Sequence, residues 1–318
     1  MKKHYIGIDL GGTNISVGVV DEQYKIISKA STKTNCPRSS EEIAEDMVRV
    51  SLEAVESSGL TLNDIEWIGV GSPGIANSEK GIIEYSNNLN FLNVPLAEMI
   101  EKKLGRPVFV ENDANAAAYG EFVAGAAKDV NNAVVITLGT GVGGGIIIDG
   151  KIYSGFNFGG AELGHTVIEV DGPQCTCGRK GCFEVFSSAT GLIRMTNEAM
   201  EADKSSKMWE MLDDNRVTAR LAFDAMRAGD ASAKAVVDKY IKYLAAGLTN
   251  VINIFQPEIL CIGGGICNEG DALLLPVREI VAKEVYTRNS RKNTEIVIAK
   301  LGNSAGIIGA AFLGRAQK

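Results

Sequence analysis

Short apolar runs and amphipathic stretches alternate along most of the chain. Residues 4–9 and 15–20 are apolar runs separated by two glycines, which predicts a hairpin with a glycine-rich turn. A third strand is expected near 25–33. A helix is expected at 40–57, because apolar residues recur there at helical spacing beneath a polar face. Strand and helix signals in this order are typical of a layered α/β protein.

The same alternation continues to the end of the chain. Strands are expected at 66–70, 107–111, 132–138, 143–148 and 259–265, and helices at 96–104, 114–126, 217–228, 232–254 and 305–314. The runs at 132–138 and 143–148 again flank a glycine-rich turn, which indicates two related halves. No low-complexity linker separates them. We therefore expect a small α/β domain formed by 1–115 and 303–318, and a large one formed by 116–302.

Composition and charge narrow the class of protein. With 318 residues, of which 45% are hydrophobic and 22% charged, the chain can form about two domains with a large core. No apolar run approaches the roughly 20 residues that span a membrane, and the N-terminal run lacks the features of a signal peptide. We expect a cytoplasmic protein without membrane association. The formal net charge of −7 argues against a nucleic-acid surface, which needs clustered lysine and arginine.

One segment, Glu162–Glu184, gathers one of the two histidines and three of the six cysteines of the chain. His165, Cys175, Cys177 and Cys182 supply one imidazole and three thiols. That set suits a closed, tetrahedral zinc site without an open position for catalysis. A disulfide is the alternative. The rest of the chain shows neither a disulfide-rich pattern nor a secretory signal, so structural zinc is favoured.

Three glycine-rich turns are candidates for phosphate binding. Glycines let backbone N–H groups approach a phosphate that a Cβ would hold away, and an aspartate at a strand end suits a magnesium ion. Each turn alone is a weak signal, because a tight structural turn is the alternative, but a nucleotide bound between two domains explains all three. The residues concerned are Asp9, Gly11, Gly12 and Thr13, then Gly139, Thr140 and Gly141, then Gly264 and Gly265.

The segment VENDANAAAYGE, residues 110–121, follows an apolar strand and opens a helix. Asp113 is expected where backbone donors and the positive end of the helix converge. The alternative is that Asp113 only caps the helix. In a phosphoryl-transfer enzyme an aspartate here would accept the proton of the attacking hydroxyl. Asn112 offers both a donor and an acceptor to neighbouring hydroxyls.

Taken in order, these motifs resemble the ROK family of sugar kinases and, within it, the bacterial glucokinases. They are DLGGT, ENDANAAAYGE, LGTGVGGG, ExGH followed by CxCGxxGCxE, and IGGG, and the resemblance covers essentially the entire chain. It implies a two-domain ribonuclease H-like, actin-like ATPase fold with a structural zinc site. It also implies a glycolytic enzyme that transfers the γ-phosphoryl group of ATP to the 6-hydroxyl of glucose, with Mg²⁺.

The resemblance also assigns residues to roles. Asp113 would be the catalytic base, and the glycine-rich turns would bind ATP. His165 would bind zinc through one ring nitrogen and face the sugar with the other. The expected sugar ligands are Gly74, Asn88, Asn112, Asp113, Glu162, His165 and Glu184. Because family members are commonly dimers or tetramers, a homo-oligomer is expected.

Two alternatives remain open. The first is a kinase for fructose, mannose or an N-acetylated hexosamine, although Glu162 favours unmodified glucose. The second is a non-catalytic sugar sensor, because the family includes repressors with a DNA-binding domain ahead of the kinase-like part. The first phosphate turn begins at Asp9, which leaves no room for such a domain, and the retention of Asp113 argues against a sensor. Whether polyphosphate replaces ATP is also left open.

Overall fold

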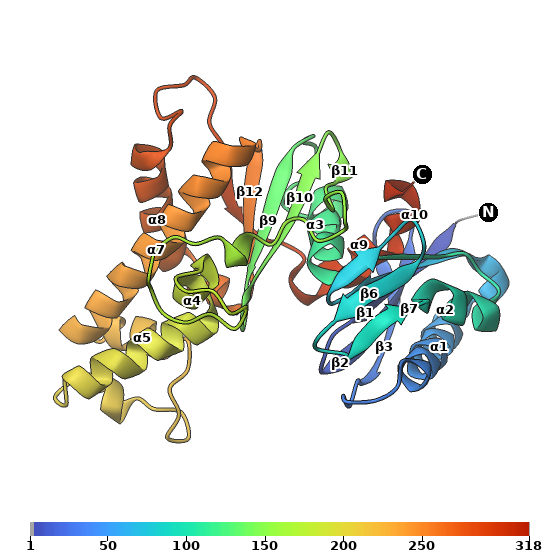
Figure 1. Ribbon diagram of the computed structural model, residues 1–318, viewed down its shortest axis with the longest axis horizontal. Coiled ribbons are helices and arrows are strands. Elements are labelled where there is room, and N and C mark those ends of the chain that lie inside the picture. Colours follow the sequence, from blue (N-terminus) through green and yellow to red (C-terminus); the bar gives the residue numbers. More distant parts are fainter. Residues whose placement is uncertain (1–2, 318) are drawn as a thin grey trace. The chain divides into compact units, whose positions relative to one another are not determined.

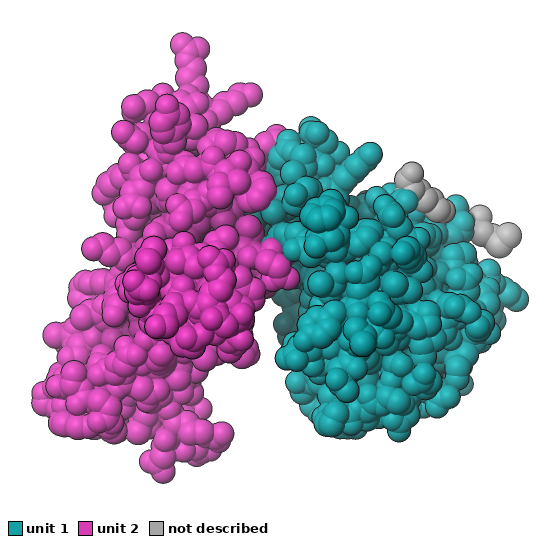
Figure 2. All heavy atoms as spheres, viewed as in Figure 1, with its two compact units in different colours: residues 1–135, 145–161, 299–318 teal, residues 136–144, 162–298 magenta. Residues whose placement is uncertain are grey.

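The computed structural model describes residues 3–317, which form two compact units (Figure 2). Unit 1 comprises residues 1–135, 145–161 and 299–318, and unit 2 comprises 136–144 and 162–298. The chain therefore passes from one unit to the other four times. Within residues 3–317, no helix combines the length and the apolar character needed to cross a bilayer.

Unit 1 contains a five-stranded sheet and a smaller three-stranded sheet (Figure 1). The larger one is formed by β1 His4–Leu10, β2 Asn14–Asp21, β3 Ile26–Lys33, β4 Ile65–Ser72 and β8 Val108–Asn112, and the smaller by β5 Ile75–Asn77, β6 Ile82–Ser86 and β7 Phe91–Val94. The order in the larger sheet is β3-β2-β1-β4-β8. Strands β1, β4 and β8 run parallel, whereas β2 and β3 are antiparallel to their neighbours. The three parallel strands thus end at a common edge.

The helices of unit 1 have recognisable beginnings and buried faces. They are α1 Ser40–Ser57, α2 Leu96–Leu104, α3 Asp113–Ala124, α9 Ala305–Ala311 and α10 Leu313–Ala316, with short 3-10 turns η1 Leu62–Asp64 and η5 Gly302–Ser304. Helix α1 begins with a capping box, in which Ser39 and Glu42 satisfy each other's backbone N–H groups. The apolar faces of α1 and α2 join the sheet in one buried core.

Helix α9 lies unusually close to its neighbours in unit 1. A Cβ on Gly7 of β1 would lie 1.9 Å from the carbonyl oxygen of Ile307, and one on Gly69 of β4 would be 1.7 Å from α9 backbone. On the other side, a Cβ on Gly309 would lie 1.7 Å from the carbonyl oxygen of Ala116 in α3. Only glycine fits such backbone-to-backbone contacts. They fix where α3 begins relative to the ends of β1 and β4.

A second five-stranded sheet has the order β11-β10-β9-β12-β13. Its strands are β9 Ala133–Leu138, β10 Val142–Ile148, β11 Lys151–Ile152, β12 Ile259–Gly263 and β13 Glu295–Ile298. The chain changes unit within β9 and again within β10. The helices of unit 2 are α4 Phe183–Ser187, α5 Ala189–Ala202, α6 Leu221–Arg227, α7 Ala231–Phe255 and α8 Asp271–Glu284, with 3-10 turns η2 Leu163–His165, η3 Lys207–Glu210 and η4 Gly265–Glu269.

The long helix α7 supports the short helix α4, which lies beside it in Figure 1. The ring of Phe183 covers Gly247, where a Cβ would come within 2.1 Å of the ring. The hydroxyl of Tyr240, fully buried, donates to the carbonyl oxygen of Ser187 at 2.7 Å. Helix α4 is thereby fixed at both ends by one rigid helix.

The structure adds elements that the sequence patterns did not predict. They include the three-stranded sheet β5-β6-β7, the helices α4, α5 and α8, and the strands β11 and β13. The single helix expected at 305–314 is divided into α9 and α10, and the helix expected at 217–228 is the shorter α6. The units also divide differently from the expected domains. Residues 116–135 belong to unit 1, because α3 packs on α9 through Gly309 and Gly120.

Candidate active site

The carboxyl ends of the three parallel strands bring Asp113, the predicted base, and Asp9, a predicted magnesium ligand, to one edge of the sheet. Asp9 is paired with Gly71 in the register of β1 and β4, and Gly71 is paired with Glu111 in that of β4 and β8. Asn112 and Asp113 follow directly, at the junction of β8 and α3. In open α/β sheets this edge is where ligands bind.

Asn112 caps α3, and Asp113 is its first residue. The Oδ1 of Asn112 accepts from the N–H groups of Ala114 at 2.9 Å and Asn115 at 3.1 Å, while its Nδ2 donates to the carbonyl oxygen of Gly74 at 3.0 Å. Asp113 is partly exposed, and its Oδ1 accepts from the Ala114 N–H at 2.9 Å. Capping, the alternative role considered for Asp113, thus belongs to Asn112. The same contacts place Gly74 beside Asn112.

The two aspartates of this edge have raised pKa values. Burial, together with the smaller effect of the negative charge of Asp113, raises the pKa of Asp9 to about 6. Burial also raises the pKa of Asp113, although the N–H of Ala114 opposes the shift. Carboxylates with raised pKa values are better proton acceptors near neutral pH. The electrostatics therefore suit general-base chemistry.

Glu111 is a buried carboxylate that the sequence analysis did not single out. It is 2% exposed, and burial raises its pKa. Its Oε1 accepts from the backbone N–H of Asn112 at 2.9 Å and from Nδ2 of Asn115 at 3.1 Å, and its Oε2 accepts from Oγ of Ser154 at 3.1 Å. These bonds hold the backbone immediately before Asp113. The only sequence signal was an acidic residue at the end of an apolar strand.

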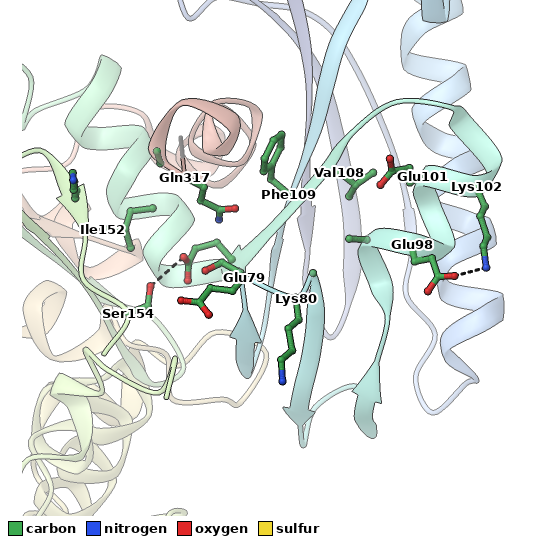
Figure 3. Close-up of a pocket in the computed structure, with 16 residues that line it drawn as sticks. Glu79, Lys80, Glu98, Glu101, Lys102, Val108, Phe109, Ile152, Ser154 and Gln317 are labelled. Atoms are coloured by element: carbon green, nitrogen blue, oxygen red, sulfur yellow. Dashed lines mark hydrogen bonds and ion pairs between the residues drawn. The ribbon is translucent and has the colours of Figure 1, made fainter. Parts of the chain in front are cut away.

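A cavity of about 780 Å³ lies in unit 1 on the outer side of β8 (Figure 3). Ser154 and its hydrogen bond to Glu111 lie on one side of it, and the ion pair of Glu98 and Lys102 lies on another. None of the residues predicted to bind sugar, ATP or metal lines this cavity. It therefore is not the predicted site, and it meets the catalytic segment only through Glu111.

Two hydrogen bonds donated by Thr34 hold the first glycine-rich turn of unit 1. The Oγ1 of this fully buried residue donates to the carbonyl oxygen of Gly11 at 2.6 Å, and its N–H donates to that of Thr13 at 2.9 Å. A Cβ on Gly12 would be no nearer than 3.7 Å to another atom, the Cβ of Asn88. Packing therefore does not require a glycine at position 12, and Asn88 lies beside the turn.

The turn between β9 and β10 lies in unit 2. The N–H of Gly139 donates to the carbonyl oxygen of Gly141 at 3.0 Å, which closes the turn. A Cβ on Gly139 would meet nothing within 4 Å, whereas one on Gly141 would lie 2.3 Å from Oε2 of Glu184. Thr140, between them, is exposed. Packing thus explains Gly141 but leaves open space at Gly139.

In the third turn, after β12, packing again requires one glycine and leaves open space at another. Gly264 has a φ of +99°, and its Cβ would lie 2.2 Å from the carbonyl oxygen of Leu138, so packing alone requires glycine there. A Cβ on Gly265 would meet nothing within 4 Å. Only Gly265 therefore remains as a position where the absence of a side chain leaves room for a ligand.

The four predicted metal ligands meet in unit 2. Their ligand atoms all lie within 4.8 Å of one another. Nδ1 of His165 is 3.7 Å from Sγ of Cys175, and the sulfurs of Cys177 and Cys182 are 3.7 Å apart. A tetrahedron with ligand bonds of about 2.3 Å has edges of about 3.8 Å, whereas sulfurs in a disulfide lie about 2 Å apart. The cluster therefore fits a tetrahedral metal ion, and its cysteines are free thiols.

Backbone contacts and one helix hold the loop that carries this cluster. Gly181 has a φ of +70°, and its Cβ would lie 1.6 Å from the carbonyl oxygen of Glu169. The N–H of Cys175 donates to the carbonyl oxygen of Arg179 at 2.8 Å, which forms the tight turn between the thiols. The hydroxyl of Tyr243, from α7, donates to Glu169. The loop is thus fixed to the same helix as α4.

The predicted sugar ligands of unit 2 flank the cluster. Glu162 precedes the 3-10 turn that ends at His165, and the His165 N–H donates to the Glu162 carbonyl oxygen at 3.1 Å. Glu184 is the second residue of α4, and its Oε2 accepts from the N–H of Val142 at 2.9 Å. One carboxylate oxygen of Glu184 is therefore directed at the turn between β9 and β10.

A profile of the ROK family matches residues 5–317. The chain belongs to the ROK family. It is 39% identical to the glucokinase of Thermotoga maritima over 315 residues, which cover 98% of this chain and 97% of that one. A ROK family glucokinase from Streptomyces griseus, solved in complex with glucose and AMPPNP, matches with a TM-score of 0.81 and 33% identity over 98% and 99% of the two chains. The xylose repressor of Bacillus spizizenii is 30% identical, over 97% of this chain and 76% of its own length.

These matches confirm the expected fold. This ROK chain has the ribonuclease H-like, actin-like ATPase fold of the ROK sugar kinases. Each unit brings together a subset of the predicted residues. Unit 1 holds Asp9, Gly11, Gly12, Thr13, Gly74, Asn88, Asn112 and Asp113, and unit 2 holds Gly139, Thr140, Gly141, Glu162, His165, Cys175, Cys177, Cys182, Glu184, Gly264 and Gly265.

Proposed function

We propose that this ROK protein phosphorylates glucose at its 6-hydroxyl with ATP. The observation that carries the proposal is the position of Asp113, which lies at the carboxyl end of parallel strands, next to Asp9, with a raised pKa. Its full-length relatives include proteins named glucokinase from several bacteria. Phosphoryl transfer depends mainly on positioning and charge stabilisation, and one well-placed base completes it.

In this proposal Asp113 accepts the proton of the attacking 6-hydroxyl. Its pKa, raised by burial, makes it a stronger base than an exposed aspartate. An uncharged sugar needs directional hydrogen bonds for recognition, and amide, imidazole and carboxylate groups provide them. The proposed sugar ligands are Gly74, Asn88, Asn112, Asp113, Glu162, His165 and Glu184.

ATP would be bound by the glycine-rich turns. The open space at Gly139 and Gly265 supports this, and so does Gly12, where a Cβ would make only an ordinary contact with Asn88, because packing does not require glycine at these positions. Mg²⁺ accompanies ATP and neutralises phosphate charge, and the Asp9 carboxylate is a hard oxygen ligand of the kind this ion prefers. The other residues proposed for ATP are Gly11, Thr13, Thr140, Gly141 and Gly264.

We further propose that the metal cluster holds zinc in a structural role. One imidazole and three thiols fit Zn²⁺ and leave no open position for a water nucleophile. The spacing of the sulfurs and of Nδ1 supports a tetrahedral ion. With Nδ1 of His165 turned to the metal, Nε2 is the nitrogen that would remain for the sugar.

The test replaces the proposed base while preserving its shape. Asp113→Asn should lower kcat about a thousandfold, the range of general-base catalysis, and leave glucose affinity nearly unchanged. Initial rates with ATP and titration calorimetry with glucose measure the two effects. Asp129→Asn, at an exposed position of the same unit, is the matched control. Near-normal turnover of Asp113→Asn would refute the assignment.

The unmodified protein separates the alternative functions. Comparing kcat/KM for glucose, fructose, mannose and N-acetylated hexosamines, with ATP or polyphosphate as donor, identifies the substrate and the donor. Sugar binding without turnover of any hexose would favour a non-catalytic sensor, the role that the repressor relatives suggest. A cytoplasmic location, a place in glycolysis and a homo-oligomeric state, dimer or tetramer, stay predictions.

A further inference from the structure

Glu184 connects the turn Gly139–Gly141 to the metal cluster, within unit 2. Its Oε2 accepts from the N–H of Val142 at 2.9 Å, and its Oε1 lies 3.7 Å from Sγ of Cys175. A Cβ on Gly141 would come within 2.3 Å of the same Oε2. The carboxylate therefore fills the space that the glycine leaves. One side chain contacts both the cluster and the turn.

The start of α5 holds the other side of this turn. The N–H of Ala189 donates to the carbonyl oxygen of Gly139 at 2.8 Å, and Oγ1 of Thr190 donates to that of Thr140 at 2.8 Å. Helix α5 follows α4 directly, and the N-cap of α4 is Cys182, one of the cluster thiols. A continuous segment thus runs from a metal ligand to two anchors of the turn.

These contacts leave the centre of the turn available. The N–H groups of Gly139 and Val142 are hydrogen-bonded within unit 2. The N–H groups of Thr140 and Gly141 take part in none of the hydrogen bonds found among residues 3–317. Consecutive backbone N–H groups of this kind form a concave site for an anion such as a phosphate. The anchors fix the shape of the turn, and its two central donors are left for a ligand.

We infer that the metal cluster positions the phosphate turn Gly139–Gly141 through Glu184 and Thr190. The inference rests on the proposed function, which assigns ATP to this turn. When the metal ion is lost, the thiols of Cys175 and Cys182 lose their common anchor, and α4 with Glu184 becomes free to shift. Nucleotide affinity then falls even when no sugar is present. Glu184 and Thr190 are positioning residues, because they hold the turn without needing to touch the nucleotide.

The first arm of the test removes the ion. Titration calorimetry with Mg²⁺–AMPPNP, in the absence of sugar, compares the zinc-loaded protein with protein from which the metal was stripped and the chelator removed. We expect at least a tenfold loss of affinity, restored by adding zinc. Circular dichroism shows whether the stripped protein stays folded. If it does and AMPPNP affinity is unchanged, the inference is wrong.

The second arm of the test keeps the metal ion bound. It tests the inference even if the metal-stripped protein unfolds. Thr190→Val removes one hydrogen bond to the turn, so AMPPNP affinity should fall about fivefold, the usual worth of one neutral hydrogen bond. Metal content and glucose affinity should stay as in the unmodified protein. Thr218→Val, elsewhere in unit 2, is the matched control. Unchanged AMPPNP affinity in Thr190→Val would overturn the inference.

The outcomes also separate this inference from the proposed function. If the unmodified, zinc-loaded protein does not bind AMPPNP, the proposed function fails and the inference fails with it. If it binds AMPPNP and both arms leave that affinity intact while metal removal weakens glucose binding, the proposed function stands. The cluster would then act only through the sugar ligands, and the inference would be wrong.

Discussion

The carboxyl group of Asp113 lies close enough to Asp9 to influence the protonation of Asp9. Burial is the larger cause of the raised pKa of Asp9, and the charge of Asp113 is the second. Both effects oppose ionisation, so the folded protein holds its protons to a higher pH than the unfolded chain does. This edge of the sheet therefore destabilises the folded protein when its carboxyl groups are ionised.

The free energy of unfolding of the ligand-free protein should therefore depend on pH through Asp9. Asp9 has a pKa of about 6 in the folded state and about 3.9 when unfolded, so between these values the folded state binds more protons. The free energy of unfolding should fall as pH rises from about 4 to about 6, by up to roughly 3 kcal/mol. Asp9→Asn should remove this part of the slope. Urea denaturation at several pH values, without Mg²⁺ or ATP, measures it.

Other buried acidic residues should also make the free energy of unfolding fall as pH rises. Asp113 and Glu111 also have pKa values raised by burial, so Asp9→Asn should flatten the slope without abolishing it. Glu56→Gln, on the exposed side of α1, is the control for removing a carboxylate. If Asp9→Asn kept the slope of the unmodified protein, the shift assigned to Asp9 would be wrong.

At the residue scale, the sequence was enough to predict site residues that lie close to one another along the chain. Asp113 was recognisable because a strand, an Asn-Asp pair and a helix follow one another, and the metal ligands because they lie within one segment. Glu111, Ser154 and Thr190 were not recognisable. Ser154 is 43 residues from Glu111 along the chain, and only the folded backbone brings the two within 3.1 Å. No spacing rule encodes such a contact.

Among the elements, α9 makes backbone contacts that position the edge of the sheet carrying Asp9 and Asp113. It contacts β1 and β4 through glycines of the strands and α3 through its own Gly309. The backbones are so close that any side chain must displace a helix or a strand. Because α3 begins at Asp113, displacement of α3 would also move the proposed base.

Gly309→Ala tests this packing. Alanine is intrinsically better than glycine in a helix by about 1 kcal/mol, so propensity alone predicts a gain. We expect instead a loss of about 3 kcal/mol or more, because the new Cβ would overlap the carbonyl oxygen of Ala116. Urea denaturation measures the change. Gly265→Ala is the control, since its Cβ would meet nothing within 4 Å and its backbone does not adopt the left-handed conformation. A stabilised Gly309→Ala protein would contradict the packing described here.

The elements that the sequence missed have weak patterns for physical reasons. Strand β7 has only four residues, with exposed positions in its middle, so neither alternation nor a buried run is visible. Helix α8 contains Pro276, which lowers any helix prediction. By contrast, β1, β2 and α7 are long and strongly patterned, and they lie where they were expected.

At the scale of the whole molecule, neither unit is formed by one continuous segment of the chain. Unit 2 begins within β9 and ends at Ile298, and the chain then returns to unit 1 to form α9. The core of unit 1 therefore contains residues from both ends of the sequence. Phe312 and Leu313, near the C-terminus, are fully buried in it.

A chain that ends at Ile298 should show this dependence. Without α9, the glycine-bearing face of β1 and β4 loses its cover, so unit 1 should lose its protected amides while unit 2 keeps most of its own. Hydrogen exchange followed by mass spectrometry reports each unit separately. A chain that ends at Ala316, which keeps α9, is the control. Full protection of unit 1 in the shorter chain would contradict this prediction.

The glycines that contact α9 have a consequence for how related proteins diverge. Gly7, Gly69 and Gly309 are required by backbone contact alone, whereas Asp113 is required only for the proposed chemistry. A descendant that abandoned phosphoryl transfer would be released from keeping the aspartate but would still need the glycines to fold. In a homologue, the glycines therefore indicate that the fold is kept, and the aspartate indicates that the activity is kept. A homologue can have the glycines without the aspartate.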